Sequence, residues 1–422
     1  MQVKKLLILG SDFFTYRAVE EAKKMGVYVI VADYLNETPT KMIADESWLV
    51  STTDIDTLYE KALNEKISGI FCGASDFNVE NMRVLCKRLK LPLYCSNDFA
   101  WAVSRNKALF KDICFEVGAP VSKDYSMLDI SNSDELDSIE YPVVVKPVDK
   151  SGNRGVSFCY NSDELKKGYL EAKNISDNER IVIEKMLSGT EHHVCYAADA
   201  GEFKLISFAE ASHDKNQLSN IYSFERTTNR FLQQYLDEAN DAAIRVFKRI
   251  GCTDGLVWLD TMRDSKSGKF YFLEMGYRFA GAVASSHMQK RMYGFDPVKW
   301  MLECSLGMKH EFEFDKIDLR LGYDSFVALA HMFTKQDAVI KEINGANELK
   351  NKNDIYLDLP KKVGDKVRGL ATVALINIYG KNKEDLIEKL KYVNDTFKIY
   401  DQDGSNILIY YTDYKNILES FE

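Results

Sequence analysis

A cationic, glycine-containing loop follows one of the most apolar runs of the chain. The run "VVV" leads directly into Lys146, and the loop that follows it contains Lys150, Arg154 and two glycines. An ammonium group beside an apolar strand needs an anionic partner. Phosphate oxygens would serve, with the backbone N–H groups of the loop closing over them. The spacing is not that of a Walker A loop, and a mobile surface hairpin is the alternative interpretation.

Two carboxylates are predicted to face each other further along the chain. In "GLVWLDTMRDSKSGKFYFLEMGYRF", two apolar strands flank a turn, and a turn centred on its second serine makes Asp260 and Glu274 cross-strand neighbours. They would share a face with Trp258 and Phe272. Opposed like charges are destabilising unless a cation lies between them, and oxygen ligands suit Mg²⁺ bound to nucleotide phosphates. A buried salt bridge to Arg278 or another base is the alternative.

Other polar residues are weaker candidates. Lys107 lies in a helix-like segment, where a single lysine is usually a solvated amine. In "VIEKMLSGTEHH", Glu184 lies near the end of an apolar strand and Glu191 follows seven residues later. The backbone of the linker between them could pair with an adenine, and a carboxylate could accept hydrogen bonds from ribose hydroxyls. The alternative is that Glu184 and Glu191 are ordinary surface glutamates. His192 and His193 lack a third ligand at metal spacing, so we expect them to be structural.

The first hundred residues alternate strand-like and helix-like segments. This rhythm predicts a parallel sheet with helices on both faces in a domain that ends near residue 103. "GSDFFT", after the first strand, lacks the GxGxxG spacing of a dinucleotide site. Substrate binding at the carboxyl ends of the strands is expected instead, and a tight turn without a ligand is the alternative. The expected strands are 3–9, 27–33, 47–51 and 69–75, with helices at 16–26 and 79–90.

The rest of the chain is predicted to form two further domains. A helix at 105–118 leads to short strands around "PVVVKP" and "GVSFCY" within a domain that spans 104–310. Beyond residue 310 the pattern changes to isolated strands and one long helix, which indicates a separate α+β cap at 311–422. The fold class is therefore α/β and α+β.

Composition restricts the class of protein. The chain has 422 residues, 45% apolar and 28% charged, with a net charge of -9, so it is globular and any anion site must be local. We expect no nucleic-acid partner. Eight scattered cysteines without a CxxC pair indicate reduced thiols in the cytoplasm. No segment approaches the roughly 20 apolar residues of a membrane span, so no membrane contact is expected.

Taken in order, Lys107, "VVVKPVDKSGNRGV", "IEKMLSGTE", Asp260 and "LEMGYRF" resemble the ATP-grasp superfamily of carboxylate–amine ligases. The resemblance covers residues 1–310, and the tail is similar to the C-terminal domain of the biotin-carboxylase-like and L-amino-acid-ligase-like branches. It implies an ATP-grasp fold: an N-terminal Rossmann-like domain, a lid at about residues 115–185, and a third domain, with ATP held between two sheets. It also implies Mg²⁺, small carboxylate and amine substrates, and a homodimer.

The resemblance assigns a role to each matching residue. Lys107 and Lys146 would bind the ATP phosphates, and Arg278 would stabilise the transferred phosphoryl group. Asp260 and Glu274 would bind magnesium. Nucleotide contacts are implied for the phosphate loop, the adenine hinge and the ribose acid: Lys150, Ser151, Gly152, Gly155, Val156, Glu184, Lys185, Met186, Leu187 and Glu191.

One position departs from the family pattern E-[IM]-N-x-R. Gly276 stands where an asparagine amide commonly completes the second magnesium shell. The implied reaction is attack of a carboxylate on the γ-phosphate, followed by attack of an amine on the acyl phosphate. Arg226, His213 and His287 could reach a substrate. Two alternatives remain: a bicarbonate-using enzyme of the carboxylase or carbamoyl-phosphate synthase type, and a nucleotide-binding regulatory protein that lost catalysis.

Overall fold

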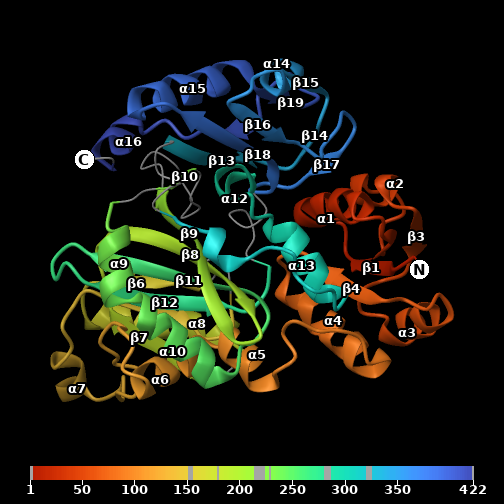
Figure 1. Ribbon diagram of the computed structural model, residues 1–422. Helices are drawn as coiled ribbons and strands as arrows, with labels where there is room; N and C mark the ends of the chain where they lie inside the picture. The colour runs from red at the N-terminus through yellow and green to blue at the C-terminus, as the bar shows by residue number, and fades with distance from the viewer. Residues whose placement is uncertain are drawn as a thin grey trace.

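A computed structural model describes most of the chain (Figure 1). Its elements lie in an N-terminal α/β part, a small lid sheet, and a large antiparallel sheet that runs into the C-terminal third. Among the described residues, no helix is long and apolar enough to cross a membrane. The described residues are 3–150, 155–177, 180–212, 224–227, 230–279, 287–319 and 326–420.

The N-terminal part is the parallel, helix-covered sheet that the sequence predicts. Its four strands are all parallel in the order β3-β2-β1-β4. Asp12 begins the first helix with a capping box to Thr15, and the carboxylate of Asp33 accepts a hydrogen bond from the N–H of Ser11. The elements are β1 (Lys5–Leu9), α1 (Phe13–Lys24), β2 (Tyr28–Asp33), α2 (Pro39–Ile43), β3 (Glu46–Leu49), α3 (Ile55–Asn64), β4 (Gly69–Cys72), α4 (Asp76–Leu89) and α5 (Asp98–Ser104).

The next segment builds the lid around a three-stranded antiparallel sheet in the order β6-β5-β7. Its buried residues form a core of their own, separate from the core shared by the N-terminal part and the large sheet. The run "VVV" is the centre of β5, and Lys146 follows it within the same strand. The elements are α6 (Lys107–Glu116), α7 (Ser133–Asp137), β5 (Val143–Pro147), β6 (Ser157–Cys159), α8 (Ser162–Ile175) and β7 (Ile181–Lys185).

A large antiparallel sheet forms the body of the molecule. Its strands β12-β11-β8-β9 carry the predicted hairpin at one end, and β10 joins them to the C-terminal strands. Helix α13 packs against β4 and so connects this body to the N-terminal sheet. The elements are β8 (Gly189–Asp199), β9 (Glu202–Ser212), β10 (Phe224–Thr227), α9 (Leu232–Glu238), α10 (Asn240–Ile250), β11 (Gly255–Asp264), β12 (Phe270–Gly276), α12 (Met288–Tyr293), α13 (Pro297–Ser305) and the 3₁₀ helix η1 (Phe314–Lys316).

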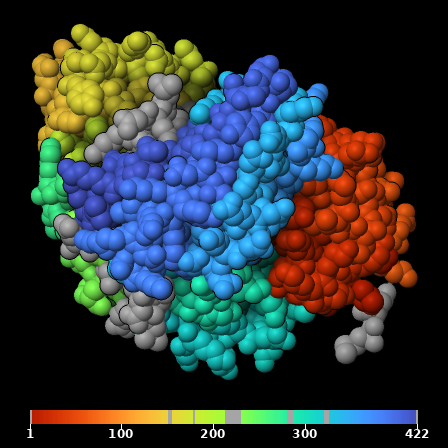
Figure 2. Space-filling view, turned by 90° about the horizontal axis from the view of Figure 1, so that it is seen from above, coloured from red at the N-terminus to blue at the C-terminus, as the bar shows by residue number. Residues whose placement is uncertain are grey.

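The C-terminal third continues the same sheet through β13, β18 and β16, a continuity that the sequence does not predict. It also has a core of its own. Figure 2 shows this third, in blue, lying between the lid and the N-terminal part. The elements are β13 (Phe326–Thr334), β14 (Ala338–Val339), β15 (Glu342–Asn344), α14 (Ala346–Lys350), β16 (Ile355–Asp358), β17 (Lys366–Val367), β18 (Thr372–Gly380), α15 (Lys383–Thr396), β19 (Lys398–Tyr400), β20 (Leu408–Ile409) and α16 (Tyr414–Ser420).

Gly69 offers a test of how the N-terminal sheet docks on α13. A Cβ at this position would lie 2.1 Å from the backbone oxygen of Ser305, so the strand and the helix would have to separate. We expect Gly69→Ala to lower the free energy of unfolding by about 1–3 kcal/mol. The control is Gly369→Ala, where the nearest atom to the new Cβ lies 3.3 Å away. Thermal melting should show a clearly larger loss for Gly69→Ala, and equal losses would contradict this packing.

Candidate active site

The hairpin of β11 and β12 places Asp260 opposite Glu274, as the sequence predicts. The two residues are partners in the antiparallel register, and Trp258 pairs with Gly276 two positions away on the same face. Both carboxylate side chains reach solvent, with 22% of Asp260 and 34% of Glu274 exposed. The pair is therefore available to a bound ion or ligand.

The expected position of Phe272 on this face is wrong. A β-bulge between Asp260 and Thr261 shifts the register, so that Phe272 pairs with Thr261 instead. Phe272 and Thr261 are both buried, whereas Asp260 is not. The aromatic ring therefore faces the core on the other side of the sheet.

Lys107 forms an ion pair with this hairpin. It begins α6 directly after the capping residue Asn106. Its Nζ lies 2.7 Å from Glu274 Oε2 and donates a hydrogen bond of 3.0 Å to the carbonyl oxygen of Lys150. Burial alone would raise the pKa of Glu274, but nearby cations, Lys107 first among them, lower it below its usual range. The ion pair expected as an alternative thus exists, with Lys107 rather than Arg278 as the direct partner.

Glu184 is the centre of a buried polar cluster that joins the lid sheet to α6. Its Oε1 contacts the Nζ of Lys146 across the strand pair β5 and β7. Its Oε2 lies 2.5 Å from the Nζ of Lys111 and accepts a 2.9 Å hydrogen bond from the hydroxyl of Ser122. Burial alone would raise the pKa of Glu184, but Lys146 and Lys111 outweigh it and lower the pKa to about 2. The cluster therefore holds an ionised carboxylate between two ammonium groups.

The linker after β7 is the segment expected to bind an adenine. The N–H of Met186 donates to the carbonyl oxygen of Pro142 at 3.0 Å, so an adenine would have to use other backbone groups of Lys185–Leu187. The side chain of Lys185 donates to the carbonyl oxygen of Glu140 at 2.8 Å. The backbone N–H of Lys185 also donates within the protein, to the carbonyl oxygen of Lys123 at 2.9 Å.

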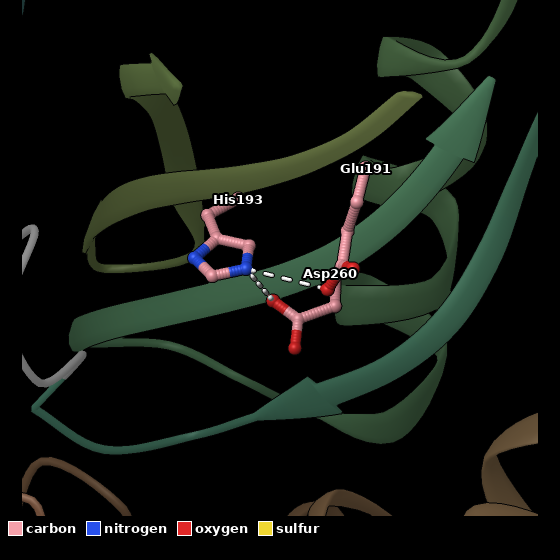
Figure 3. Close-up of side chains that lie close together, drawn as sticks. All are labelled: Glu191, His193 and Asp260. Carbon is pink, nitrogen blue, oxygen red and sulfur yellow. Dashed lines mark ion pairs between the residues drawn. The ribbon is translucent and has the colours of Figure 1, made fainter. Parts of the chain in front are cut away.

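Glu191, His193 and Asp260 converge on the same face of the large sheet (Figure 3). The Nε2 of His193 lies 3.4 Å from Glu191 Oε1 and 3.9 Å from Asp260 Oδ1. His192 faces the opposite side, where it is buried and stacks on Phe208 with ring centroids 4.7 Å apart. The structural role expected of both histidines fits His192, whereas His193 lies among carboxylates.

Arg278 lies just beyond the hairpin, between an acid and an indole ring. Its Nε contacts the carboxylate of Asp76 in the first turn of α4, and its Nη1 donates to the carbonyl oxygen of Phe279 at 3.0 Å. Its guanidinium carbon lies 5.1 Å from the centre of the Trp258 ring, a distance typical of a cation–π contact. These contacts hold the guanidinium near the end of the hairpin.

Trp258 also accounts for the glycine at position 276. A Cβ on Gly276 would lie 2.2 Å from Cε2 and Cζ2 of the indole ring, which is closer than real contacts allow. The amide that the family pattern leads one to expect has no space here unless the ring moves. Position 276 therefore cannot supply an oxygen ligand.

Several expected site residues cannot be placed. Ser151, Gly152, Arg154 and His213 lie outside the described residues, and for Arg226 only the backbone is described, in β10.

The remaining expected residues are placed as follows. Gly155 has a positive φ of 74°, and Val156 precedes β6. His287 stacks on Tyr356 of the C-terminal third, with ring centroids 4.1 Å apart. Its ring is thus in contact with β16.

Four residues of the site were not expected from the sequence. Lys111 follows Lys107 by one helical turn, so helical periodicity would have placed both on one face. His193 follows Glu191 by two residues, which is the period of a strand face. Ser122 and Asp76 come from segments whose position depends on the tertiary fold, and nothing local in the sequence indicates them.

Comparisons with known proteins find relatives of a large part of the chain. The model for the ATP-binding domain of the carbamoyl-phosphate synthase L chain matches residues 106–312. The formate-dependent phosphoribosylglycinamide formyltransferase of Prochlorococcus marinus (strain NATL1A) is 23% identical over 256 residues, which cover 59% of this chain and 64% of that protein. The N-terminal section of the carbamoyl phosphate synthase large chain of Aquifex aeolicus is 23% identical over 72% of this chain and 58% of its own length.

Solved structures share the fold at low sequence identity. The biotin carboxylase domain of Hydrogenobacter thermophilus 2-oxoglutarate carboxylase has a TM-score of 0.78 at 17% identity and covers 96% of this chain and 92% of its own. The L-amino acid ligase of Bacillus licheniformis has a TM-score of 0.73 at 17% identity, covering 95% and 100%. Residues 106–312 are thus similar to the ATP-binding domain of the carbamoyl-phosphate synthase L chain, and the chain as a whole shares the ATP-grasp fold of these solved structures.

Proposed function

We propose that this chain is an ATP-dependent carboxylate–amine ligase that forms an amide bond through an acyl phosphate and releases ADP and phosphate. The observation that carries the proposal is the pairing of two lysines with two carboxylates where the lid meets the hairpin: Lys107 with Glu274, and Lys146 with Glu184. Such lysines can exchange a carboxylate for a phosphate oxygen without a change in their own protonation. The site thus offers positive charge to an anion, such as a nucleotide phosphate, that arrives with a bound metal ion.

The residues present fit ATP and magnesium. Asp260 and Glu274 supply carboxylate oxygens from adjacent strands, and the lowered pKa of Glu274 keeps it ionised at neutral pH. When bound there, Mg²⁺ would neutralise charge on the β- and γ-phosphates. Glu184–Leu187 and Glu191 would hold the nucleoside, and residues 150–156 would contact its phosphates.

The chain's own residues mainly position the reactants and balance charge. The carboxylate oxygen of the acid would bond to the γ-phosphorus while the bond from that phosphorus to the β,γ-bridging oxygen breaks, giving ADP and an acyl phosphate. The nitrogen of the amine would then attack the acyl carbon and lose a proton as phosphate leaves. Arg278, held by Asp76 and Trp258, would stabilise the negative charge on the transferred group.

A second candidate is a bicarbonate-using enzyme of the same fold. It is favoured by the similarity to the biotin carboxylase domain of the Hydrogenobacter 2-oxoglutarate carboxylase, whose structure contains MgADP and bicarbonate. The two candidates share the phosphoryl transfer step and differ in the acid that attacks the γ-phosphate. Substrate screens therefore have to include bicarbonate beside amino acids.

The reaction type is tested through its products. The assay contains Mg²⁺, ATP and a pair of amino acids, one supplying the carboxylate and the other the amine. We expect ADP and phosphate to be released only when the amino acid that supplies the carboxylate is present. Hydroxylamine in place of the amine should trap the acyl phosphate as a hydroxamate, measured by colour with ferric ion or by mass. Release that depends on bicarbonate instead would favour the second candidate. AMP and pyrophosphate as products, or no acid-dependent release at all, would overturn the proposal.

Glu274 tests the metal assignment. Glu274→Gln keeps the shape of the side chain but removes its charge, so we expect turnover to fall at least about 100-fold. The free energy of unfolding should change by only about 1 kcal/mol or less, because the lost ion pair with Lys107 is partly exposed. The control is Glu116→Gln, which removes a surface ion pair with Arg249. Turnover equal to that of the control at saturating Mg²⁺ would contradict the assignment.

Glu184 tests the buried cluster through its pH dependence. Its pKa is about 2 in the folded chain and near 4.5 when unperturbed, so the stabilisation it provides is complete above pH 4.5 and is lost as the pH falls toward 2. This difference corresponds to about 3 kcal/mol at neutral pH. We expect Glu184→Gln to melt well below the wild type at pH 7, and the difference between the two melting temperatures to shrink steadily as the pH falls from 4.5 toward 2. A constant difference over this range would show that the carboxylate is not held by its lysines.

A further inference from the structure

Strand geometry brings a histidine into the carboxylate face of the large sheet. Glu191 and His193 alternate along β8 and so point to the same side. His193 pairs with Asp260 of β11, and Glu191 pairs with Met262, which places the three polar side chains next to one another. Figure 3 shows them converging, with one nitrogen of the imidazole facing both carboxylates. The backbone register therefore places the three residues as neighbours on one face of the sheet.

The separations of the three donor atoms suit a single metal ion. An ion lies about 2.0–2.2 Å from nitrogen and oxygen ligands, so two donors on one ion are separated by at most about 4.4 Å. The two distances from His193 Nε2, 3.4 Å and 3.9 Å, fall within this limit. All three donors lie within 4.8 Å of one another, so the remaining pair needs to close by only a few tenths of an ångström at most.

The electrostatics of the face also favour a cation. Two carboxylates so close together repel each other unless positive charge lies between them. The side chains of Glu191, His193 and Asp260 are 25%, 11% and 22% exposed, so an ion can enter and keep water ligands. On the other side of Asp260, Glu274 already has the ammonium group of Lys107 at 2.7 Å.

The ligand types decide which metal is preferred. Magnesium is bound almost entirely by oxygen, whereas imidazole suits first-row transition ions such as Mn²⁺, Co²⁺ and Zn²⁺. Position 276 cannot add an amide oxygen on the β12 side, because Trp258 fills that space. The additional metal ligand on this face is therefore the imidazole nitrogen of His193, in place of an amide oxygen from position 276.

We propose that Glu191, His193 and Asp260 form a divalent-cation site that selects a first-row transition ion over Mg²⁺. The site shares Asp260 with the magnesium assignment proposed above and deepens that function by naming the class of metal. It does not require the ligase reaction, since the three ligands are brought together by the sheet alone.

The test measures metal binding to the full chain without nucleotide. Titration with Mn²⁺, followed by electron paramagnetic resonance, gives the affinity, and electron spin-echo modulation detects a directly bound ¹⁴N nucleus. We expect the wild type to show a ¹⁴N signal and to bind Mn²⁺ more tightly than Mg²⁺ in competition. His193→Gln should lose the ¹⁴N signal and at least about 10- to 100-fold in Mn²⁺ affinity.

Two further variants keep the result interpretable. Glu191→Gln preserves the size of the side chain and should also weaken Mn²⁺ binding, with the ¹⁴N signal of any bound ion retained. His331→Gln removes a histidine from β13 of the same sheet and should leave both readouts unchanged. Melting curves confirm that each variant is folded.

The outcomes separate this inference from the proposed function. A wild type without a ¹⁴N signal, or a His193→Gln variant that binds Mn²⁺ as tightly as the His331→Gln control, would overturn the metal site, whatever the ADP assay shows. Acid-dependent ADP release with Mg²⁺ alone would leave the ligase proposal standing in that case. Conversely, if Mn²⁺ binding depends on His193 but the chain releases no ADP, the metal-site proposal stands and the ligase proposal is rejected.

Discussion

The carboxylate of Glu184 is the contact on which the rest of the site depends. It joins Lys146 of the lid sheet to Lys111 of α6, so one buried group sets the position of the lid strands relative to the helix that also carries Lys107. A buried carboxylate without these partners would be strongly destabilising, because its charge would be desolvated without compensation. The fold therefore holds a charged centre that is stable only when its cations are in place.

The same principle extends to the hairpin. Lys107 and Glu274 neutralise each other at 2.7 Å, and Asp76 holds Arg278. A nucleotide with its metal could replace these contacts in matched pairs, phosphate for carboxylate at the lysines and metal for ammonium at the acids. Because charge is conserved in such an exchange, a preformed site of this kind avoids leaving buried charges unpaired in either state.

Parts of the site that depend on local geometry could be predicted from the sequence. The turn between β11 and β12 is short, so counting residues places Asp260 within one residue of its partner. Next to the turn Thr261 pairs with Phe272, and the adjacent bulge is what brings Asp260 opposite Glu274. Phe272 could not be placed, because a bulge inserts an extra residue without a local signal. The N-terminal parallel sheet follows from the alternation of its segments, whereas the continuity of the large sheet into the C-terminal third depends on contacts between residues far apart in the chain, such as β10 with β13.

That continuity limits how the chain can be divided. Strand β10 pairs with β9 on one side and with β13 on the other, so separating β10 from β13 would leave unpaired N–H and C=O groups on both strands. Each half would then present an open edge to other chains and tend to aggregate. During evolution, the C-terminal third could not be exchanged by simple fusion, because the strands that pair with it, β10 first among them, would have to change together with it.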